Sequence, residues 1–366
     1  MKILVGMSGG VDSSTTALLL KKQGHEVIGV TMTIWGETET CKKIKNNNAN
    51  NQKTHSACLG EDENKKIEEI KKFAQKENIE FHVIDCASAY EEIVLENFRE
   101  EYSKGRTPNP CVICNSNIKF GALIEYAKKQ GIEFDKFATG HYAKIEKNQQ
   151  GRYIVKRNTN DKKDQSYFLY RLTQNQLKDI FFPLGEYTKE EIRKMANDFG
   201  IETANKPDSQ DFYNGDYNDI LQKEPMEGNI VDINGKILGK HKGFWNYTIG
   251  QRKGLMVSAP EPLYVLKLDA DKNEVIVGFK DKTLNHKIIA NNLNWIAFEK
   301  LEEEIKCLAK IRSTQEATPV LVKPINEEKI EVTFENIQNS IATGQSIVLY
   351  KDDLLLGGGI IDEVIN

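Results

Sequence analysis

Short apolar runs alternate with amphipathic helical patterns from the start of the chain to about residue 212. The runs at residues 3–5, 26–33, 79–85 and 134–138 are short and largely apolar or β-branched, which predicts buried strands. Helices are expected at residues 13–22, where Gly24 caps the C-terminal end, and at residues 63–75 and 90–102. Strands that alternate with helices favour a parallel sheet wrapped on both faces, and such sheets bind ligands at the carboxyl ends of their strands.

The pattern changes in the second half of the chain. A hairpin is predicted from the runs 264–268 and 274–277 around the turn at residues 271–273. Strict apolar–polar alternation at residues 330–335 and 346–349 predicts a small antiparallel sheet or barrel. Residues 42–53 are rich in asparagine, and we expect a mobile surface insertion there.

These patterns predict an α/β protein of three domains. Residues 1–212 would form a doubly wound parallel-sheet domain. Residues 213–285 would form a small mixed domain, and residues 286–366 an antiparallel β-barrel. A chain of 366 residues is too long for one ordinary hydrophobic core, which agrees with this division.

Composition narrows the class of protein. No apolar run approaches the ~20 residues of a membrane span, and no N-terminal signal pattern is present, so we expect a cytoplasmic protein without a membrane partner. The net charge of -4 neither predicts nor excludes a polyanion partner, because local basic patches make that contact. The six cysteines are better explained as thiols or metal ligands than as a disulfide framework.

The sequence SGGVDSS at residues 8–14 joins the first predicted strand to the first predicted helix. A glycine-rich turn at a helix N-terminus exposes backbone N–H groups, and the helix dipole adds partial positive charge, so the segment is suited to bind phosphate. It lacks the Gly-Lys-Ser/Thr ending of a Walker A loop, which disfavours γ-phosphate transfer. The alternative is an ordinary tight turn.

A second segment, GRTPNPCVICN at residues 105–115, combines a rigid loop with two cysteines. Prolines on both sides of Asn109 exclude helix there and stiffen the loop. Cys114 falls near the start of a predicted helix that includes residues 121–129. We expect the helix N-terminus to lower the pKa of this thiol, which suits a nucleophile or a metal ligand. The alternative is that Cys111 and Cys114 are two partly buried structural cysteines.

Both segments resemble known enzymes. The SGGVDS loop looks like the pyrophosphate loop of ATP-pyrophosphatases, which leaves asparagine-, arginine-, GMP- and RNA-modifying branches open. The TPNP segment, followed four residues later by Cys114 and then by Ile-Lys-Phe at residues 118–120, is similar to that of the tRNA-specific 2-thiouridylases. Matching segments follow in the order of that family, so the resemblance covers residues 2 to about 361. They are residues 138–142, 163–170, 206–210, 248–255, 343–346 and 356–361.

The resemblance implies ATP-dependent thiolation of a tRNA uridine, with the wobble uridine as the expected target. ATP adenylates O2 of the uracil, a sulfur nucleophile attacks C2, and AMP departs. ATP and Mg²⁺ are the implied cofactors, and Asp12 is expected to help hold the metal. For Met32 the alternative is a simple core position. The implied ATP-binding residues are Gly6, Met7, Ser8, Gly9, Gly10, Val11, Asp12, Ser13, Met32 and Gly140.

The same resemblance assigns residues to the RNA. Asn109, Pro110 and Cys111 would face the target base, and Cys114 occupies the position of the reactive cysteine. A lone lysine is more often a solvated charge, and His141 is alternatively a buried, hydrogen-bonded histidine. The other implied RNA contacts are His141, Lys163, Asp164, Gln165, Arg252, Lys253, Arg312, Ser313 and Gln345.

The chain departs from the family pattern at two positions. Cys111 stands where the common loop has Asp, and Tyr213 stands where the family has its second cysteine, so the usual disulfide-forming mechanism does not transfer. Two interpretations remain open. Cys58, Cys111 and Cys114 would bind three irons of a [4Fe–4S] cluster and leave one iron free for sulfide. Alternatively, Cys114 carries a persulfide that Cys111 resolves, and Cys58 is a plain loop cysteine.

The expected partners are tRNA and a sulfur donor, either a persulfide-relay protein or inorganic sulfide, and we expect a monomer. Three other functions remain open: a paralogue that thiolates a different RNA position, a non-catalytic RNA-binding paralogue, and a small-molecule ligase with a pyrophosphate loop. The small-molecule ligase is disfavoured because such enzymes lack the Pro-Asn-Pro-x-x-x-Cys loop and the terminal barrel.

Overall fold

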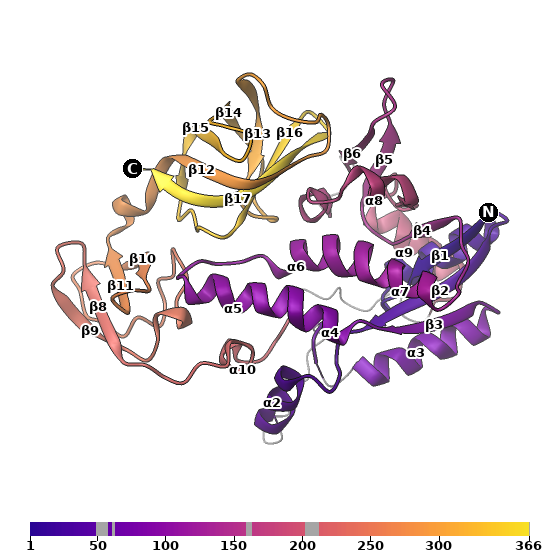
Figure 1. Cartoon of the computed structure of the whole chain (residues 1–366), viewed down its shortest axis with the longest axis horizontal. Helices are drawn as coiled ribbons and strands as arrows, with labels where there is room; N and C mark the ends of the chain where they lie inside the picture. The colour runs from indigo at the N-terminus through magenta and orange to yellow at the C-terminus, as the bar shows by residue number, and fades with distance from the viewer. Residues whose placement is uncertain (49–57, 61–62, 159–162, 202–211, 366) are drawn as a thin grey trace. The chain divides into compact units, whose positions relative to one another are not determined.

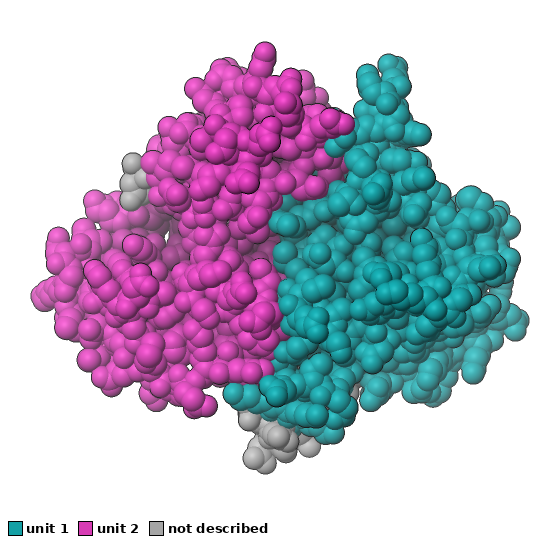
Figure 2. All heavy atoms as spheres, in the orientation of Figure 1, with its two compact units in different colours: residues 1–94, 111–215, 353–355 teal, residues 95–110, 216–352, 356–366 magenta. Residues whose placement is uncertain are grey.

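The computed structural model describes residues 1–48, 58–60, 63–158, 163–201 and 212–365. These residues form two compact units, coloured separately in Figure 2. Unit 1 contains residues 1–94, 111–215 and 353–355. Unit 2 contains residues 95–110, 216–352 and 356–366. The units are therefore not consecutive in sequence, because the chain crosses between them several times.

Unit 1 is built on a five-stranded parallel sheet with the strand order β3-β2-β1-β4-β7. The apolar stretch of β1 is fully buried, which confirms the prediction of a buried first strand. Ile3 and Val5 pack in one core with Ala17 of α1, Ile70 of α3 and Ala196 of α9. The strands are β1 (Lys2–Gly6), β2 (Glu26–Thr33), β3 (Glu80–Asp85), β4 (Lys136–Ala138) and β7 (Ile180–Phe181), with the hairpin β5 (Ala143–Lys147) and β6 (Tyr153–Arg157).

Two helical stretches follow β3 and contain π-helical turns, which are rare and often occur at functional sites. The first runs through α4 (Ala87–Tyr90), η1 (Glu91–Leu95) and α5 (Glu96–Ser103). The second runs through α6 (Pro110–Ile113), η2 (Cys114–Ala122) and α7 (Leu123–Lys129). It begins earlier than the sequence pattern indicated, because a proline is well tolerated in the first turn of a helix. Of these helices, α5 lies in unit 2, whereas the following helices lie in unit 1: α1 (Val11–Lys22), α2 (Glu39–Asn48), α3 (Glu63–Lys76), η3 (Ser166–Leu169), α8 (Gln174–Asp179) and α9 (Lys189–Asp198).

The prediction of a mobile insertion at residues 42–53 is wrong for its first part. Residues 42–48 belong to α2, which Cys41 and Ile44 anchor with buried side chains. The Thr40 hydroxyl also donates a hydrogen bond to Glu91, with 2.6 Å between the oxygens. Residues 49–53 lie outside the described part of the chain.

Unit 2 contains a four-stranded sheet and a closed barrel (Figure 1). The sheet has the order β10-β11-β8-β9, and its β10–β11 pair is the predicted hairpin. The barrel runs β12-β15-β14-β13-β16-β17 and closes through antiparallel pairing of β12 with β17, which confirms the predicted C-terminal barrel. The elements are α10 (Tyr217–Leu221), β8 (Gly228–Asp232), β9 (Ile237–His241), η4 (Phe244–Asn246), β10 (Tyr264–Asp269), β11 (Glu274–Gly278), η5 (Lys280–Thr283), β12 (Leu284–Trp295), β13 (Ile305–Lys310), β14 (Thr318–Pro324), β15 (Ile330–Asn339), β16 (Ser346–Lys351) and β17 (Leu354–Ile365).

The model is an α/β structure, as the sequence predicted. No helix in the described ranges is long and apolar enough to cross a membrane.

An ion pair joins α9 to the first turn of α1. Lys189 Nζ lies 2.9 Å from both carboxylate oxygens of Asp12, and the Tyr142 hydroxyl donates to Asp12 Oδ1 at 2.7 Å. The Lys189 side chain is only 9% exposed. Removing one partner of a buried pair leaves the other charge uncompensated, so this contact contributes to the stability of unit 1.

We predict that Lys189→Met lowers the free energy of unfolding by about 3 kcal/mol, because it leaves the Asp12 carboxylate without its cation. Urea unfolding would measure the change. Lys144→Met is the matched control, since Lys144 pairs with Glu186 at 3.3 Å on an exposed surface and should contribute at most about 1 kcal/mol. Equal losses in the two variants would contradict the prediction.

Candidate functional site

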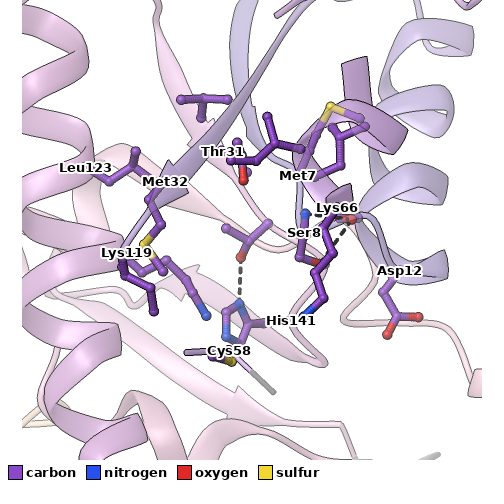
Figure 3. Close-up of a pocket in the computed structure, with 18 of the residues that line it drawn as sticks. Met7, Ser8, Asp12, Thr31, Met32, Cys58, Lys66, Lys119, Leu123 and His141 are labelled. Atoms are coloured by element: carbon purple, nitrogen blue, oxygen red, sulfur yellow. Dashed lines mark hydrogen bonds between the residues drawn. The ribbon is translucent and has the colours of Figure 1, made fainter. Parts of the chain in front are cut away.

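A cavity of about 320 Å³ opens in unit 1 beside the carboxyl ends of β1, β2 and β4 (Figure 3). This is the edge where parallel sheets bind ligands. Most of the predicted ATP-binding residues line it, but Gly9, Gly10 and Val11 do not. The predicted residues in its lining are Gly6, Met7, Ser8, Asp12, Ser13, Met32 and Gly140.

The glycine loop holds its own shape and leaves the start of α1 open. The Ser8 amide donates to Ser13 Oγ at 3.1 Å, and the Ser13 hydroxyl donates to the Gly10 carbonyl at 3.1 Å. Gly9 has a φ of 76°, a conformation that favours glycine. No side chain caps α1, so its first N–H groups keep no side-chain acceptor. This arrangement fits an anion such as the phosphates of a nucleotide.

Gly140 lies against the same loop from β4. A Cβ atom at this position would be 2.9 Å from the Asp12 carbonyl carbon, so a larger residue would push the strand away from α1. The neighbouring Thr139 hydroxyl and His141 Nδ1 are 2.7 Å apart. The backbone at the floor of the cavity is therefore closely packed and fixed.

Two lysines that the sequence analysis did not assign enter the cavity. In Figure 3 the amines of Lys66 and Lys119 point toward its middle from opposite sides, while the Asp12 carboxylate is turned away. Lys119 belongs to the Ile-Lys-Phe motif of the resemblance, which was the signal that could have found it. Cations at this place complement the charge of bound phosphates.

Glu63, in the first turn of α3, is the buried acid of the cavity wall. Its carboxylate accepts hydrogen bonds from the amides of Ile34 and Trp35, at 2.9 and 3.0 Å, and from the Thr33 hydroxyl. Burial raises the pKa of Glu63, and these hydrogen bonds oppose the rise. Glu63 thus fixes the chain that follows β2, where Met32 lines the cavity. Nothing local in the sequence distinguishes it from other glutamates of α3.

Cys58 and the two cysteines of the second segment, Cys111 and Cys114, influence one another electrostatically in unit 1. Burial raises the pKa of the Cys114 thiol to about 12; Lys119 opposes the rise, and Cys58 and Cys111 add to it. The expectation of a lowered pKa for Cys114 is therefore wrong. The helix begins at Pro110, so Cys114 is not at its N-terminus, and desolvation dominates. Cys58 is exposed and lines the cavity.

The resemblance places Tyr213 where the family has its second cysteine, and the structure shows which chain segment lies beside it. The Leu59 amide donates to the Phe212 carbonyl at 2.9 Å. Cys58 precedes Leu59, and Tyr213 follows Phe212. Cys58 is therefore the chain neighbour of a residue that is hydrogen-bonded to the segment containing Tyr213.

Among the described residues, no group of three or more His, Cys, Asp or Glu is spaced to hold a single metal ion. A [4Fe–4S] cluster spreads its thiolates over several irons and so needs a wider spacing than one ion. Cys58 and Cys111 both act on the pKa of Cys114, so the three thiols belong to one part of unit 1. Both oxygens of Asp12 contact Lys189, so a cation of the chain already balances this carboxylate, and its expected role at a magnesium ion stays a prediction.

The RNA contacts expected in unit 1 have different environments. His141 is buried between the rings of Phe120 and Phe182 and lines the cavity. Asp164 accepts hydrogen bonds from the amide and hydroxyl of Ser166, and Gln165 bonds the Tyr142 backbone through both its side chain and its amide. Lys163 is exposed.

The RNA contacts expected in unit 2 also divide into two groups. Arg252 and Lys253 are exposed on a turn that follows Gly250, whose φ is 85°. Arg312, although exposed, donates to the Ser340 carbonyl at 2.7 Å, and Ser313 beside it is partly buried. Gln345 donates to the carbonyls of Thr107 and Pro108. The partly buried Asn109 and Pro110 follow these two residues in the chain.

Three family models match the chain in succession. Residues 1–213 match the tRNA methyl transferase HUP domain, residues 218–279 the tRNA methyl transferase PRC-barrel domain, and residues 285–361 the aminomethyltransferase beta-barrel domain.

Full-length relatives carry a more specific name. The chain is 48% identical over 364 residues to the tRNA-specific 2-thiouridylase MnmA of Endomicrobium trichonymphae, covering 99% of each chain. It is 44% identical over 370 residues to tRNA-specific 2-thiouridylase MnmA 1 of Caldanaerobacter subterraneus subsp. tengcongensis, covering 99% of this chain and 98% of the relative. A solved 4-thiouridine synthetase–RNA complex with bound ATP is similar at 17% identity and a TM-score of 0.32, over 57% of this chain and 44% of that one. The full-length identities decide the family: the chain belongs to the tRNA-specific 2-thiouridylases.

Proposed function

We propose that this protein thiolates C2 of a tRNA uridine, with ATP as the activating substrate and the wobble uridine as the target. The observation that carries the proposal is a single cavity that is lined both by the first turn of α1, a helix without a side-chain cap, and by Cys58. A phosphate site supplies activation, and a thiol beside it supplies a place for sulfur chemistry. Membership in the family supports the same reaction.

The reaction proceeds in two substitutions. The uridine O2 attacks the α-phosphorus of ATP, the bond to the β-phosphate breaks, and pyrophosphate leaves. A sulfur nucleophile then adds to C2, the C2–O2 bond breaks, and AMP carries the oxygen away. The first step turns a poor leaving oxygen into a good one. The reaction balances as ATP to AMP and pyrophosphate, with sulfur replacing oxygen on the base.

Residues of unit 1 perform the first step. The open N–H groups of α1 bind phosphate oxygens, and Lys66 and Lys119 balance their charge from the two sides of the cavity. Met32 and Gly140 flank the adenine. Mg²⁺ is commonly bound through substrate phosphates with only one or two protein carboxylates. We therefore assign it to ATP and give Asp12 the role of anchoring α1 to Lys189.

For the sulfur step we propose that Cys58, Cys111 and Cys114 hold a [4Fe–4S] cluster with one open iron. When bound, such a cluster supplies an iron site that can take up sulfide. Two findings support the assignment: the thiols are near neighbours, and Cys58 adjoins the segment that contains Tyr213. A raised pKa for free Cys114 disfavours the competing mechanism, in which that thiolate accepts a persulfide.

The remaining parts of the proposal concern partners and place. Sulfur comes from inorganic sulfide or from a persulfide-relay protein, and the protein acts as a cytoplasmic monomer. A paralogue that acts on another RNA position would need the same cavity, so the identity of the modified nucleotide separates the two. A small-molecule ligase does not account for the three matched regions that cover most of the chain.

The first test measures thiolation directly. Protein purified without oxygen is incubated with ATP, sulfide and unmodified tRNA. The 2-thiouridine formed is quantified by nucleoside mass spectrometry, and the pyrophosphate released is measured in the same reaction. We expect Cys114→Ser to lose thiolation but retain tRNA-dependent release of pyrophosphate, because ATP chemistry occurs at the α1 loop. Cys307→Ser, in strand β13, is the matched control and should retain both. Thiolation by the Cys114 variant would contradict the proposed role of this residue.

The second test measures iron. Protein purified without oxygen should contain about four irons per chain. We expect Cys58→Ala, Cys111→Ala and Cys114→Ala each to lose iron and the visible absorption of the cluster, because each removes a ligand. Cys307→Ala should keep both. A wild-type protein that thiolates fully without iron would overturn the cluster and return the sulfur to a persulfide on Cys114.

The third test concerns His141, which is held neutral inside the site. Burial lowers the pKa of His141 well below 6.5, and Lys119 adds to the shift. The unfolded chain therefore binds a proton below pH 6.5 that the folded protein does not, so stability is complete above pH 6.5 and falls as the pH decreases. Between pH 7.5 and 5.5, wild type should lose about 1.4 kcal/mol more stability than His141→Gln.

Urea unfolding at the two pH values provides the measurement. His286→Gln is the matched control, because His286 is an exposed histidine of β12 and its variant should follow wild type. A His141 variant with the same pH dependence as wild type would show that the histidine protonates in the folded protein.

A further inference from the structure

The loop between β15 and β16, residues 340–345, is in contact with three other segments of unit 2. Those segments are residues 105–108, the turn around Gly250, and the turn around Arg312. Each contains or adjoins residues that the resemblance assigns to RNA. Segments far apart in the sequence are thus connected through one short loop.

The contacts to residues 105–108 are the most extensive. The Thr107 amide donates to the Thr343 carbonyl at 2.8 Å. Gln345 Nε2 donates to the carbonyl oxygens of Thr107 and Pro108 at 3.0 and 3.1 Å. Gly344 has a φ of 89°, and a Cβ there would lie 2.9 Å from the Thr107 nitrogen and oxygen. The two pieces of backbone are therefore as close as glycine allows.

The residues on either side of these contacts are also fixed. Arg106 donates to Glu101 at 2.7 Å, to Asp362 at 3.1 Å and to the Ile361 carbonyl at 3.2 Å. The Gly344 amide donates to the Ile361 carbonyl, and the Ile361 amide to the Gln345 carbonyl, both at 2.8 Å. Strand β17 thus holds both the loop and the Arg106 side chain.

The other two segments meet the loop at Ser340. A Cβ on Gly250 would lie 2.4 Å from Ser340 Cβ, so the turn that carries Arg252 rests directly on this residue. Arg312 donates to the Ser340 carbonyl at 2.7 Å. One loop therefore supports the exposed cations of the Gly250 turn and the segment that leads to Asn109.

We propose that Gln345 is a positioning residue, which holds the segment before Asn109 in the conformation that receives the target base. This inference rests on the proposed function. A primary amide has two N–H donors, and Gln345 directs them to two successive carbonyls. An RNA contact through this NH2 group would require breaking those bonds, which would leave two partly buried carbonyls without this donor. Gln345 therefore acts on the base through the Thr107–Pro108 backbone.

The test separates positioning from RNA binding. Gln345→Met keeps the length of the side chain but removes both donors. We expect kcat for tRNA thiolation to fall at least about tenfold, because a misplaced reacting group slows the chemical step, while KM for tRNA changes less than about threefold. A direct RNA contact predicts the reverse, a raised KM with kcat unchanged.

Gln338→Met is the matched control in the same barrel. Gln338 is 5% exposed and donates to the Asn336 carbonyl at 2.9 Å, but it does not contact residues 105–108. It should lower the melting temperature without changing kcat. If the fall in kcat of the Gln345 variant is no larger than its fraction of unfolded protein, which thermal unfolding measures, the positioning role is overturned.

Hydrogen–deuterium exchange gives an answer that does not depend on activity. Exchange at the Thr107 amide should be slow in wild type and faster in Gln345→Met, with the strands of the barrel unchanged. Unchanged exchange at Thr107 would overturn the inference even in an active enzyme. If wild type fails to thiolate tRNA, the proposed function fails, while exchange still tests the hold of Gln345 on the segment.

Discussion

The first backbone N–H groups of helix α1 have no capping side chain, and the arrangement of the surrounding elements of unit 1 depends on this constraint. A helix that begins with free N–H groups must meet an anion or water, and here no side chain caps the helix, while Asp12 and Ser13 of its first turn line the cavity. Two contacts with neighbouring elements hold the N-terminus of α1 in this position. Gly140 allows β4 to approach, and the Lys189–Asp12 pair fixes the first turn from the side away from the cavity. The open start of α1 therefore depends on this packing as much as on the glycine loop.

Sequence patterns were sufficient wherever the cause was local. The first strand, the glycine loop and α1 follow from consecutive residues, and so does the hairpin of β10 and β11. The closed barrel was expected from alternation in β15 and β16. These features need only the side-chain period and the turn residues between elements, which a single chain displays openly.

The other features depend on residues that are distant in sequence. The pKa of Cys114 was expected to be low because a helix start was placed near it, but the helix begins at Pro110 and burial raises the pKa. Lys189 pairs with Asp12, which lies 177 residues earlier in the sequence. Gln345 donates to the backbone carbonyl of Thr107, 238 residues earlier. No periodicity indicates either contact. In the sequence, nothing distinguishes Glu63 from the other glutamates of α3. Only the structure shows its hydrogen bonds to the residues at and after the end of β2.

The discontinuity of unit 2 has a consequence for synthesis of the protein. Residues 95–110 emerge early from the ribosome, yet their partners Gln345 and Asp362 are translated close to the end of the chain. Until then the segment before Asn109 has none of these hydrogen bonds. The nucleotide site, whose residues come from the first part of the chain, is translated first. A chain that ends before residue 345 therefore contains the glycine loop and α1, but it lacks Gln345 and Asp362, whose hydrogen bonds hold residues 106–108.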